Sequence, residues 1–400
     1  MKILAIGDPH FKVDNIEESK IFITNLSSYL SQNTDIEIIV VLGDVLHNHE
    51  KLHTFALNSA IEFFTMLVSH KRKCFCLVGN HDATSNTIFL TDNHWMNALK
   101  GWDGLTIVDY PIIEFIGESF ITLCPYVPDG RFLEALSHMV TVEETKKISR
   151  YLPAEKTGLP SSNNNMTYSR IKIHDWRESK CIFSHQLFDG VKMGAIVAKN
   201  VEEWKLEYPF CINGHIHENQ RPQENLYIPG SAMQEGYGDM TDKIVAVITI
   251  TDDSPVLGAG SPVLGAGKYP LIEEVDLNIK RKKIIYTTID EIDTIRDKLE
   301  KNENIDYKIV VKGSDSELKA LKNSSKYKDT LDIDNVKKIT FKTTWKEEDR
   351  VKILEDDFID CLQSLIYNEE DPYLSSLYEH VVYGKEDKSD KDVFFFSADN

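Results

Sequence analysis

The sequence predicts an α/β fold in which strands and helices alternate from the N-terminus. Three apolar runs are typical of buried strands, and each ends in glycine followed by aspartate or asparagine: "MKILAIGD" (1–8), "DIEIIVVLGD" (35–44) and "KCFCLVGN" (73–80). Amphipathic helices are expected between them, over 15–33 and 51–70. This alternation indicates a largely parallel central sheet, whose functional residues gather at the carboxyl ends of the strands.

Beyond residue 105 the sequence pattern predicts shorter strands and longer loops. A polar region at 130–175 contains an expected exposed loop at 159–166. The heptad "SPVLGAG" occurs twice in tandem between residues 254 and 267, which predicts a tolerated surface insertion. Further strands are expected within 105–124, 180–186, 208–217, 225–239 and 243–250.

Three parts are expected along the chain. Residues 1–280 carry the polar motifs and form the main domain. Residues 285–345 are more charged and predict a small α+β capping domain with a helix at 288–302. Residues 346–400 predict two amphipathic helices and a tail with three consecutive phenylalanines. Such a tail is expected to pack on this chain or on a partner, because exposed aromatic clusters are unfavourable in water.

The composition is that of an acidic globular protein. The 400 residues carry a formal net charge of −19 and are 42% apolar, which is enough for a sizeable core and two or three domains. No run of 18 apolar residues occurs, so no membrane partner and an intracellular location are expected. The charge repels nucleic acid, so a nucleic-acid substrate would need local basic patches or bound cations. The six cysteines lie mostly in apolar runs, which is typical of reduced thiols.

Polar side chains follow the predicted strands in patterns that suit metal binding. Carboxylate oxygen and imidazole nitrogen together suit manganese, zinc or iron, so two manganese or other divalent ions per chain are expected. Asp44 follows the central strand and is the natural bridge between two ions about 3.5–4 Å apart, an arrangement that serves phosphoester displacement. Asp8 and His10 are expected on one ion and the carbonyl oxygen of Asn80 on the other. The remaining expected ligands are His185, His215 and His217.

Further residues near these ligands are assigned to catalysis and substrate binding. His81 would donate a proton to the leaving oxygen or steady charge on the phosphoryl group. Asp82 would hold that imidazole in the required tautomer. Lys12 is a candidate phosphate contact, with an ordinary solvated lysine as the alternative. Histidines outside the motifs are expected at the surface: His49, His53, His70, His94, His138, His174 and His380.

A lone D-x-H is common on protein surfaces and a lone G-H-x-H is only moderately specific, whereas G-N-H-D after a strand is more specific. The order of all these motifs after apolar strands indicates a single site. In order, spacing and strand context they resemble the motifs of the calcineurin-like metallophosphoesterase superfamily over about residues 1–250. The resemblance implies a sandwich of two mixed sheets between helices, with a dinuclear metal centre at the strand ends. The matching residues are Asp8-x-His10, Gly43-Asp44, Gly79-Asn80-His81-Asp82, His185 and Gly214-His215-x-His217.

A finer resemblance is to the SbcD-type DNA repair nucleases, the meiotic recombination nuclease family. Protein phosphatases of the superfamily carry arginines in "GDxVDRG" and "RGNHE", whereas this chain has "GDVLHNHE" (43–50) and "VGNHD" (78–82). In the nucleases, a GD stretch with two apolar residues and a histidine leads into a helix. His47 matches that histidine, which implies a role in positioning the DNA strand. The stretches "TLCPYVPDG" (122–130) and "YIPGSAMQEGYGD" (227–239) also resemble the nucleases.

The nuclease resemblance implies exonuclease and endonuclease activity at DNA ends, in double-strand break processing, recombination and repair. It is strongest to the compact phage and large-virus versions. It implies C-terminal helices that bind an SbcC-type coiled-coil ABC ATPase, and a homodimer formed through a helix such as 53–67. Two alternatives stay open. One is a metallophosphoesterase acting on small-molecule or protein phosphoesters, and the other is a binding scaffold with a vestigial site.

Overall fold

The computed structural model describes most of the N-terminal 343 residues. Expectations for the loop at 159–166, the tandem heptads and the C-terminal tail lie outside the described residues, as do those for nearly all of the C-terminal helices. The described residues are 1–49, 51–141, 174–251, 269–300 and 304–343, with Leu362, Gln363 and Ile366.

The chain forms two compact units. One comprises Met1–Tyr286, Thr294–Val310 and Asp329–Thr340, and the other comprises Thr287–Asp293, Val311–Lys328 and Phe341–Asn400. The boundaries expected from the sequence, at 1–280, 285–345 and 346–400, stay predictions.

The first large sheet contains the three N-terminal strands that the sequence predicts. Its strands are β1 (Lys2–Ile6), β2 (Ile36–Val41), β3 (Lys73–Leu77), β4 (Leu105–Val108), β14 (Val245–Thr249) and β15 (Leu271–Val275). Their order is β15-β14-β1-β2-β3-β4. Strands β1 to β4 are parallel, whereas β14 and β15 are each antiparallel to their neighbours. The sheet is therefore mixed, with a parallel centre.

The second large sheet is also mixed. Its strands are β5 (Ile112–Ile116), β6 (Ser119–Leu123), β7 (Val140–Thr141), β8 (Cys181–Ser184), β11 (Phe210–Asn213), β12 (Gln220–Gln223) and β13 (Leu226–Ile228). Their order is β12-β13-β11-β8-β6-β5-β7. The inner strands β6, β8, β11 and β13 run parallel, while β5 and β12 are antiparallel to β6 and β13.

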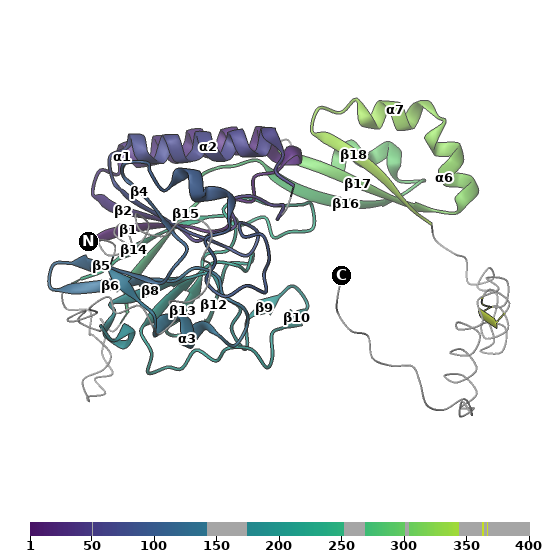
Figure 1. Ribbon diagram of the computed structural model, residues 1–400. Helices are drawn as coiled ribbons and strands as arrows, with labels where there is room; N and C mark the ends of the chain where they lie inside the picture. Colours follow the sequence, from purple (N-terminus) through teal and green to yellow (C-terminus); the bar gives the residue numbers. More distant parts are fainter. Residues whose placement is uncertain are drawn as a thin grey trace, which may run out of the picture. The chain divides into compact units, whose positions relative to one another are not determined.

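Helices cover the outer faces of the two stacked sheets. The helices α1 (Ile16–Gln32) and α2 (Thr54–Ser69) lie along the first sheet, as Figure 1 shows. The short helix α3 (Phe132–Leu136) packs in a core cluster with β8 and β11 of the second sheet. The predicted helices at 15–33 and 51–70 are confirmed, and so is the expected pair of mixed sheets between helices.

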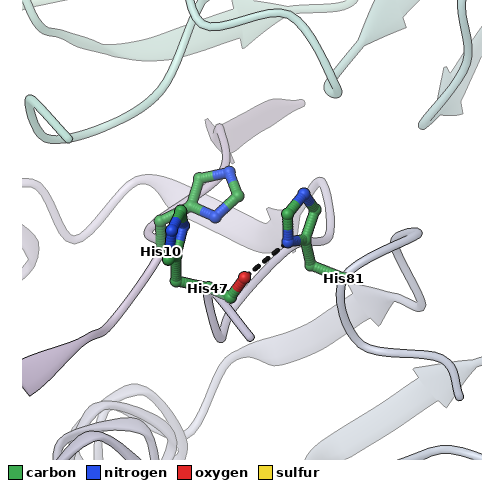
Figure 2. Close-up of side chains that lie close together, drawn as sticks. All are labelled: His10, His47 and His81. Carbon is green, nitrogen blue, oxygen red and sulfur yellow. Dashed lines mark hydrogen bonds between the residues drawn. The ribbon is translucent and has the colours of Figure 1, made fainter. Parts of the chain in front are cut away.

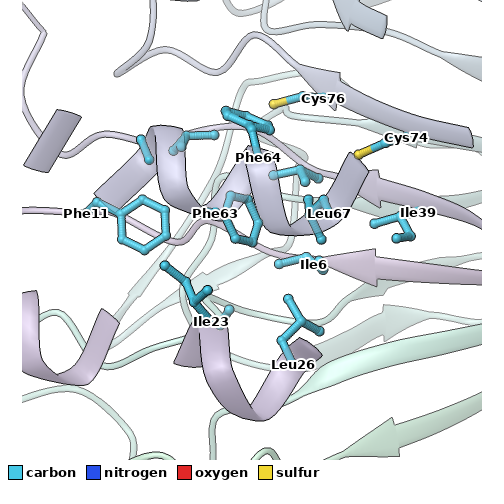
Figure 3. Close-up of a cluster of buried hydrophobic side chains, with 14 of the residues drawn as sticks. Ile6, Phe11, Ile23, Leu26, Ile39, Phe63, Phe64, Leu67, Cys74 and Cys76 are labelled. Carbon is cyan, nitrogen blue, oxygen red and sulfur yellow. The ribbon is translucent and has the colours of Figure 1, made fainter. Parts of the chain in front are cut away.

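Alternating side chains of the strands supply separate cores on the two faces of the first sheet. In β1, Leu4 and Ile6 face the core beneath α1 and α2, whereas Ile3 and Ala5 face the core between the sheets. Figure 3 shows the helix-side core around Ile6, Phe63 and Phe64. Cys74 and Cys76 of β3 both point into this core, as their spacing predicts. Because both cores are buried and packed, they hold the strand ends in fixed relative positions.

The C-terminal part of the described chain contains a smaller sheet, ordered β16-β17-β18. Its strands are β16 (Arg281–Thr288), β17 (Ile305–Gly313) and β18 (Val336–Thr343), with helices α5 (Ile295–Lys298), α6 (Asp315–Lys322) and α7 (Ser325–Leu331). The expectation of one helix over 288–302 is wrong. Strand β16 reaches Thr288, and α5 ends before Leu299, where the backbone is already extended (φ −84°, ψ 130°).

The remaining described elements are short. The strands β9 (Lys192–Met193) and β10 (Ile196–Val197) form an antiparallel hairpin, which lies between β8 and β11 in the sequence. Single turns of 3₁₀ helix occur at η1 (Val13–Asn15), η2 (Trp95–Leu99), η3 (Trp176–Glu178) and η4 (Ile292–Thr294). Among the helices of the described residues, none combines the length and the apolar content that crossing a bilayer requires.

Candidate metal centre

The predicted ligands follow strands of both large sheets. Asp8, Asp44 and Asn80 lie two or three residues past β1, β2 and β3, while His185 and His215 lie one and two residues past β8 and β11. Within each sheet these strands are parallel neighbours, so their carboxyl ends lie at a common edge. The stacking of the two sheets brings the two edges together.

One group of ligand candidates contains Asp8, His10 and His217. Their ligand atoms all lie within 4.8 Å of one another. The Nε2 atoms of His10 and His217 are only 3.0 Å apart, so both imidazoles point at the same spot. Both carboxylate oxygens of Asp8 are buried without a hydrogen-bond partner. A buried carboxylate with no donor is costly, and a bound cation would supply the missing partner.

A second group contains Asp44, His185 and His215, whose ligand atoms also lie within 4.8 Å of one another. The Oδ1 atom of Asn80 lies 3.0 Å from His185 Nε2 and 2.8 Å from His215 Nδ1, so the amide oxygen converges on the same place. Asp44 Oδ2 lies 3.3 Å from His185 Nε2 and 3.7 Å from His10 Nε2. Asp44 thus stands between the two groups, where a bridging carboxylate would be.

The electrostatics of the centre also suit a cation. Burial raises the pKa of Asp8 to about 7, with the charge of His185 opposing the rise. For His185, burial lowers the pKa, but the charges of Asp44 and Asp8 outweigh it and bring the value to about 9. Burial lowers the pKa of His215 to about 3. The centre thus gathers ionisable carboxylates and imidazoles in a buried cage, and a divalent cation would displace their protons on binding.

Comparison with known proteins identifies the family. The family model for calcineurin-like phosphoesterases matches residues 1–219, more than half of the 400-residue chain. The chain belongs to the calcineurin-like phosphoesterase family. The matched range contains every ligand candidate from Asp8 to His217, and members of this family use divalent metals.

Two relatives of this calcineurin-like phosphoesterase come from viruses. The chain is 38% identical over 325 residues, 81% of this chain and 98% of the relative, to protein 244L of Invertebrate iridescent virus 6. It is 32% identical over 332 residues, 83% of this chain and 82% of the relative, to protein 078R of Invertebrate iridescent virus 3. Both relatives carry provisional phosphoesterase names, so the similarity supports hydrolysis of phosphoesters without defining the substrate.

Three of the glycines that precede candidate ligands of the phosphoesterase have another candidate ligand packed against them. A methyl group on Gly79 would stand 2.2 Å from Asp44 Oδ1, and one on Gly43 would stand 2.7 Å from His185 Nδ1. A methyl group on Gly214 would stand 2.8 Å from Asp8 Oδ1. The repeated pattern of glycine before ligand therefore has a packing cause. Each of these three glycines makes room for a candidate ligand from a different motif, whereas a methyl group on Gly7, before Asp8, would meet the Gly230 carbonyl oxygen.

Three ligand residues adopt left-handed backbone conformations. The φ angles are 46° for His10, 47° for Asp44 and 73° for His215. Non-glycine residues in this region cost roughly 1–3 kcal/mol each, and such strain is concentrated at functional sites. The backbone N–H of His10 donates to the Asp44 carbonyl at 3.0 Å, so two of the strained turns support each other.

The His81 ring lies beside the first ligand group, as Figure 2 shows with His10 and His47. Its Nδ1 lies 2.5 Å from the backbone carbonyl of His47. A carbonyl can only accept, so Nδ1 carries a hydrogen and Nε2 is the nitrogen left for chemistry. Burial lowers the pKa of His81, while the charge of Asp44 opposes this. His49 stacks on the ring, with centroids 4.3 Å apart.

Asp82 has a different role from the expected one. Its carboxylate accepts hydrogen bonds from the backbone N–H groups of Val45 and Gly79, both at 3.1 Å, and from Trp95 Nε1 at 2.9 Å. It therefore braces the loops that carry the ligands. The partner that fixes the tautomer of His81 is the His47 carbonyl, which corrects the prediction for Asp82.

Lys12 lies two residues past His10 and is half-buried. Its backbone N–H donates to Asn15 Oδ1 at 2.9 Å, and Asn15 in turn donates from Nδ2 to the His10 carbonyl at 2.9 Å. The backbone at Lys12 thus helps to hold the first ligand loop. Contact between its ammonium group and a substrate phosphate stays a prediction.

Several residues of the site were not singled out from the sequence. Glu235 contacts three histidines, and the Tyr126 ring lies with its centroid 5.9 Å from that of His215. Both belong to stretches that resemble the nucleases, but no spacing rule marks the individual side chain. The surface prediction is wrong for His94, which is buried, whereas His49 is half-buried and stacks on His81.

Proposed function

We propose that this phosphoesterase is a phosphodiesterase that cleaves DNA with two divalent cations, manganese being the expected metal. The observation that carries the two-cation chemistry is the pair of ligand groups joined at Asp44, whose Oδ2 lies within 3.7 Å of both His10 and His185 nitrogens. DNA as the substrate is supported by the exposed rim and the resemblance of the His47 stretch. When bound, two such cations neutralise phosphate charge and lower the pKa of a water so that it can attack phosphorus in line.

The protein residues around the cations have separate roles in the proposed reaction. His81, with its Nδ1 hydrogen committed to the His47 carbonyl, presents Nε2 to the departing sugar oxygen, and as the imidazolium it would protonate that oxygen from Nε2. Asp82 holds the loops of Asp44 and Asn80 through their neighbouring backbone amides. The buried ligands keep water out of one side of the site, so the substrate enters from the other.

The open side of the site supports an extended substrate. The side chains of His47, His217 and Glu235 are 35, 28 and 20% exposed, whereas those of Asp8, Asp44 and His185 are at most 2% exposed. A polymer backbone can lie across such a rim without entering a closed pocket. His47 lies at this rim, and its stretch resembles that of the SbcD-type nucleases, which favours DNA.

A second candidate is hydrolysis of small-molecule or protein phosphoesters. The formal net charge of −19 is unfavourable for DNA and places no such restriction on a small substrate. The same cations and the same histidine would serve either substrate, so the metal centre by itself does not separate the two candidates.

The proposal is tested with the purified full-length chain and manganese. Linear duplex DNA, a chromogenic phosphodiester and a phosphomonoester are compared as substrates, and we expect cleavage of the duplex. H81N is expected to retain metal and DNA binding while cleavage falls by about 10²–10⁴-fold. The matched control is H53N, because His53 is exposed and lies directly before α2. Intact DNA together with rapid monoester turnover would support the second candidate.

We extend the proposal to partners. The region 346–400 would bind an SbcC-type ABC ATPase, and two chains would pair near the helix at 53–67, for double-strand break processing, recombination and repair. In the structure, Ala56, Phe63 and Phe64 of α2 pack in the core, while Phe55 is 63% exposed and available for contact. Co-purification of a long coiled-coil ATPase with the tagged chain from its native host would support the partnership. Light scattering of the chain alone tests the dimer.

A further inference from the structure

One carboxylate meets three histidines of the site. Glu235 Oε1 lies 3.5 Å from His10 Nδ1 and 2.7 Å from His47 Nδ1. Glu235 Oε2 lies 3.4 Å from His217 Nδ1. The Nε2 atoms of His10 and His217 face each other at 3.0 Å, so both ligand histidines turn their other nitrogen toward Glu235.

The backbone at Glu235 is fixed by its neighbours. Asp239 Oδ2 accepts hydrogen bonds from the N–H groups of Glu235, at 2.7 Å, and Gly236, at 3.1 Å. The buried side chain of Gln234 donates to the Lys282 carbonyl and accepts from the Lys282 N–H. A side chain that leaves such a held backbone has a well-defined position.

The same loop is attached to the ligand strands. The N–H of Ala232 donates to the Gly7 carbonyl at 2.9 Å, one residue before Asp8. Lys243 Nζ donates to the His217 carbonyl at 2.7 Å and to Ser231 Oγ at 2.8 Å. Motion of the loop would therefore displace both ends of the first ligand group.

We propose that Glu235 is a positioning residue, which holds His10 and His217 with Nε2 toward the first cation and ties His47 to the same group. A ligand histidine generally donates its other N–H to a carboxylate, a carbonyl or water, which fixes the ring and raises its basicity. His185 follows this pattern with the Leu42 carbonyl, 2.7 Å from its Nδ1. For His10 and His217 a single carboxylate lies opposite that nitrogen, at 3.5 and 3.4 Å, which is within ion-pair distance although His10 Nδ1 makes no hydrogen bond here. The contacts run to Nδ1 atoms, so Glu235 acts through the histidines.

A carboxylate suits this role chemically, because its two oxygens can face the Nδ1 atoms of three histidines at once. This inference concerns the metal centre, and it does not depend on DNA being the substrate.

The test compares E235Q with the wild-type full-length chain in manganese titrations, read by the electron paramagnetic resonance signal of free Mn²⁺. We expect one of two binding steps to weaken by about 10–100-fold, the usual effect of losing an outer-shell partner, with a much smaller change in the other. The matched control is E62Q, because Glu62 is exposed on α2. E235D, which keeps a shorter carboxylate, is expected to lie between E235Q and the wild type.

Activity on a chromogenic phosphodiester separates a positioning role from a catalytic one. Excess manganese is expected to restore turnover in E235Q, because the lost interaction affects metal occupancy. Unchanged titrations for both E235Q and E235D would overturn the inference. So would equal weakening of both steps, which indicates general damage, and so would intact metal binding with a loss of turnover that manganese does not restore. Failure of the chain to cleave DNA would leave these titrations valid.

Discussion

Gly79 lies where an added methyl group would stand 2.2 Å from Asp44 Oδ1 and 2.4 Å from the Asp44 backbone nitrogen. Both atoms belong to a tightly held loop, so neither can move away cheaply. G79A is expected to lose high-affinity metal binding and to lower the free energy of unfolding by about 1–3 kcal/mol or more. Metal titration and chemical denaturation measure the two effects. G101A is the control, because a methyl group there meets nothing within 4 Å, and equal behaviour of the two variants would contradict the packing argument.

At the residue scale, the sequence was most informative where chemistry and strand ends coincide. Asp8, Asp44 and Asn80 could be predicted as ligands because each follows an apolar strand, and parallel strand ends must meet. The roles of Asp82 and Glu235 could not be predicted, because they depend on which way a loop turns each side chain. Asp82 turns to backbone amides, and Glu235 turns to three imidazoles from distant motifs.

At the element scale, long amphipathic patterns were informative and short ones were not. Helices α1 and α2 have continuous apolar stripes that pack on the first sheet, so their existence follows from periodicity. The segment 288–302 has a similar pattern, yet the chain divides it between the end of β16, a 3₁₀ turn and the short α5. Only its first residue, Thr288, belongs to β16, and helical turns occupy residues 292–298, so the pattern indicated a helix here but not its bounds.

The ion pairs between the end of β4 and the two residues that flank η2 give a test at the element scale. Asp109 Oδ2, just past β4, lies 3.3 Å from His94 Nε2 and 2.6 Å from Lys100 Nζ. Burial pushes the pKa of Asp109 upward, but His94 and Lys100 outweigh it, and the pKa lies below its usual value. D109N is therefore expected to lower the free energy of unfolding at pH 7 by about 1–3 kcal/mol.

The pH dependence of that loss follows from the direction of the shift. A carboxylate with a depressed folded-state pKa contributes its full stability above the unfolded value of about 4, and loses it as the pH falls through the folded value. The difference between wild type and D109N should thus shrink below about pH 4. Urea denaturation at several pH values measures it, with D103N as the control because Asp103 is exposed. A difference that stays constant down to acid denaturation would contradict the assignment.

At the scale of the whole molecule, the net charge of −19 makes bound cations part of the argument for any nucleic-acid substrate. Two lysines near the site are engaged within the protein, since Lys243 donates to the His217 carbonyl and Lys282 pairs with Glu18 at 3.0 Å. Affinity for DNA should therefore depend on the divalent metal more strongly than a basic protein's would. The composition alone predicts that the chain repels DNA. Where bound metal cations could offset that repulsion depends on the fold.

The metal cage also sets how stability responds to metal. Its two buried aspartates, Asp8 and Asp44, lie among histidines in the two ligand groups of the described residues, so a cation that binds only the folded chain should stabilise it. Metal at 100 times its dissociation constant adds about 2.7 kcal/mol to the free energy of unfolding. Manganese is therefore expected to raise the unfolding midpoint, and a chelator to reverse the rise, as measured by calorimetry. D44N removes the carboxylate that both ligand groups share, so its midpoint should respond little to manganese. A response equal to that of the wild type would mean that metal stabilises the chain somewhere other than this cage.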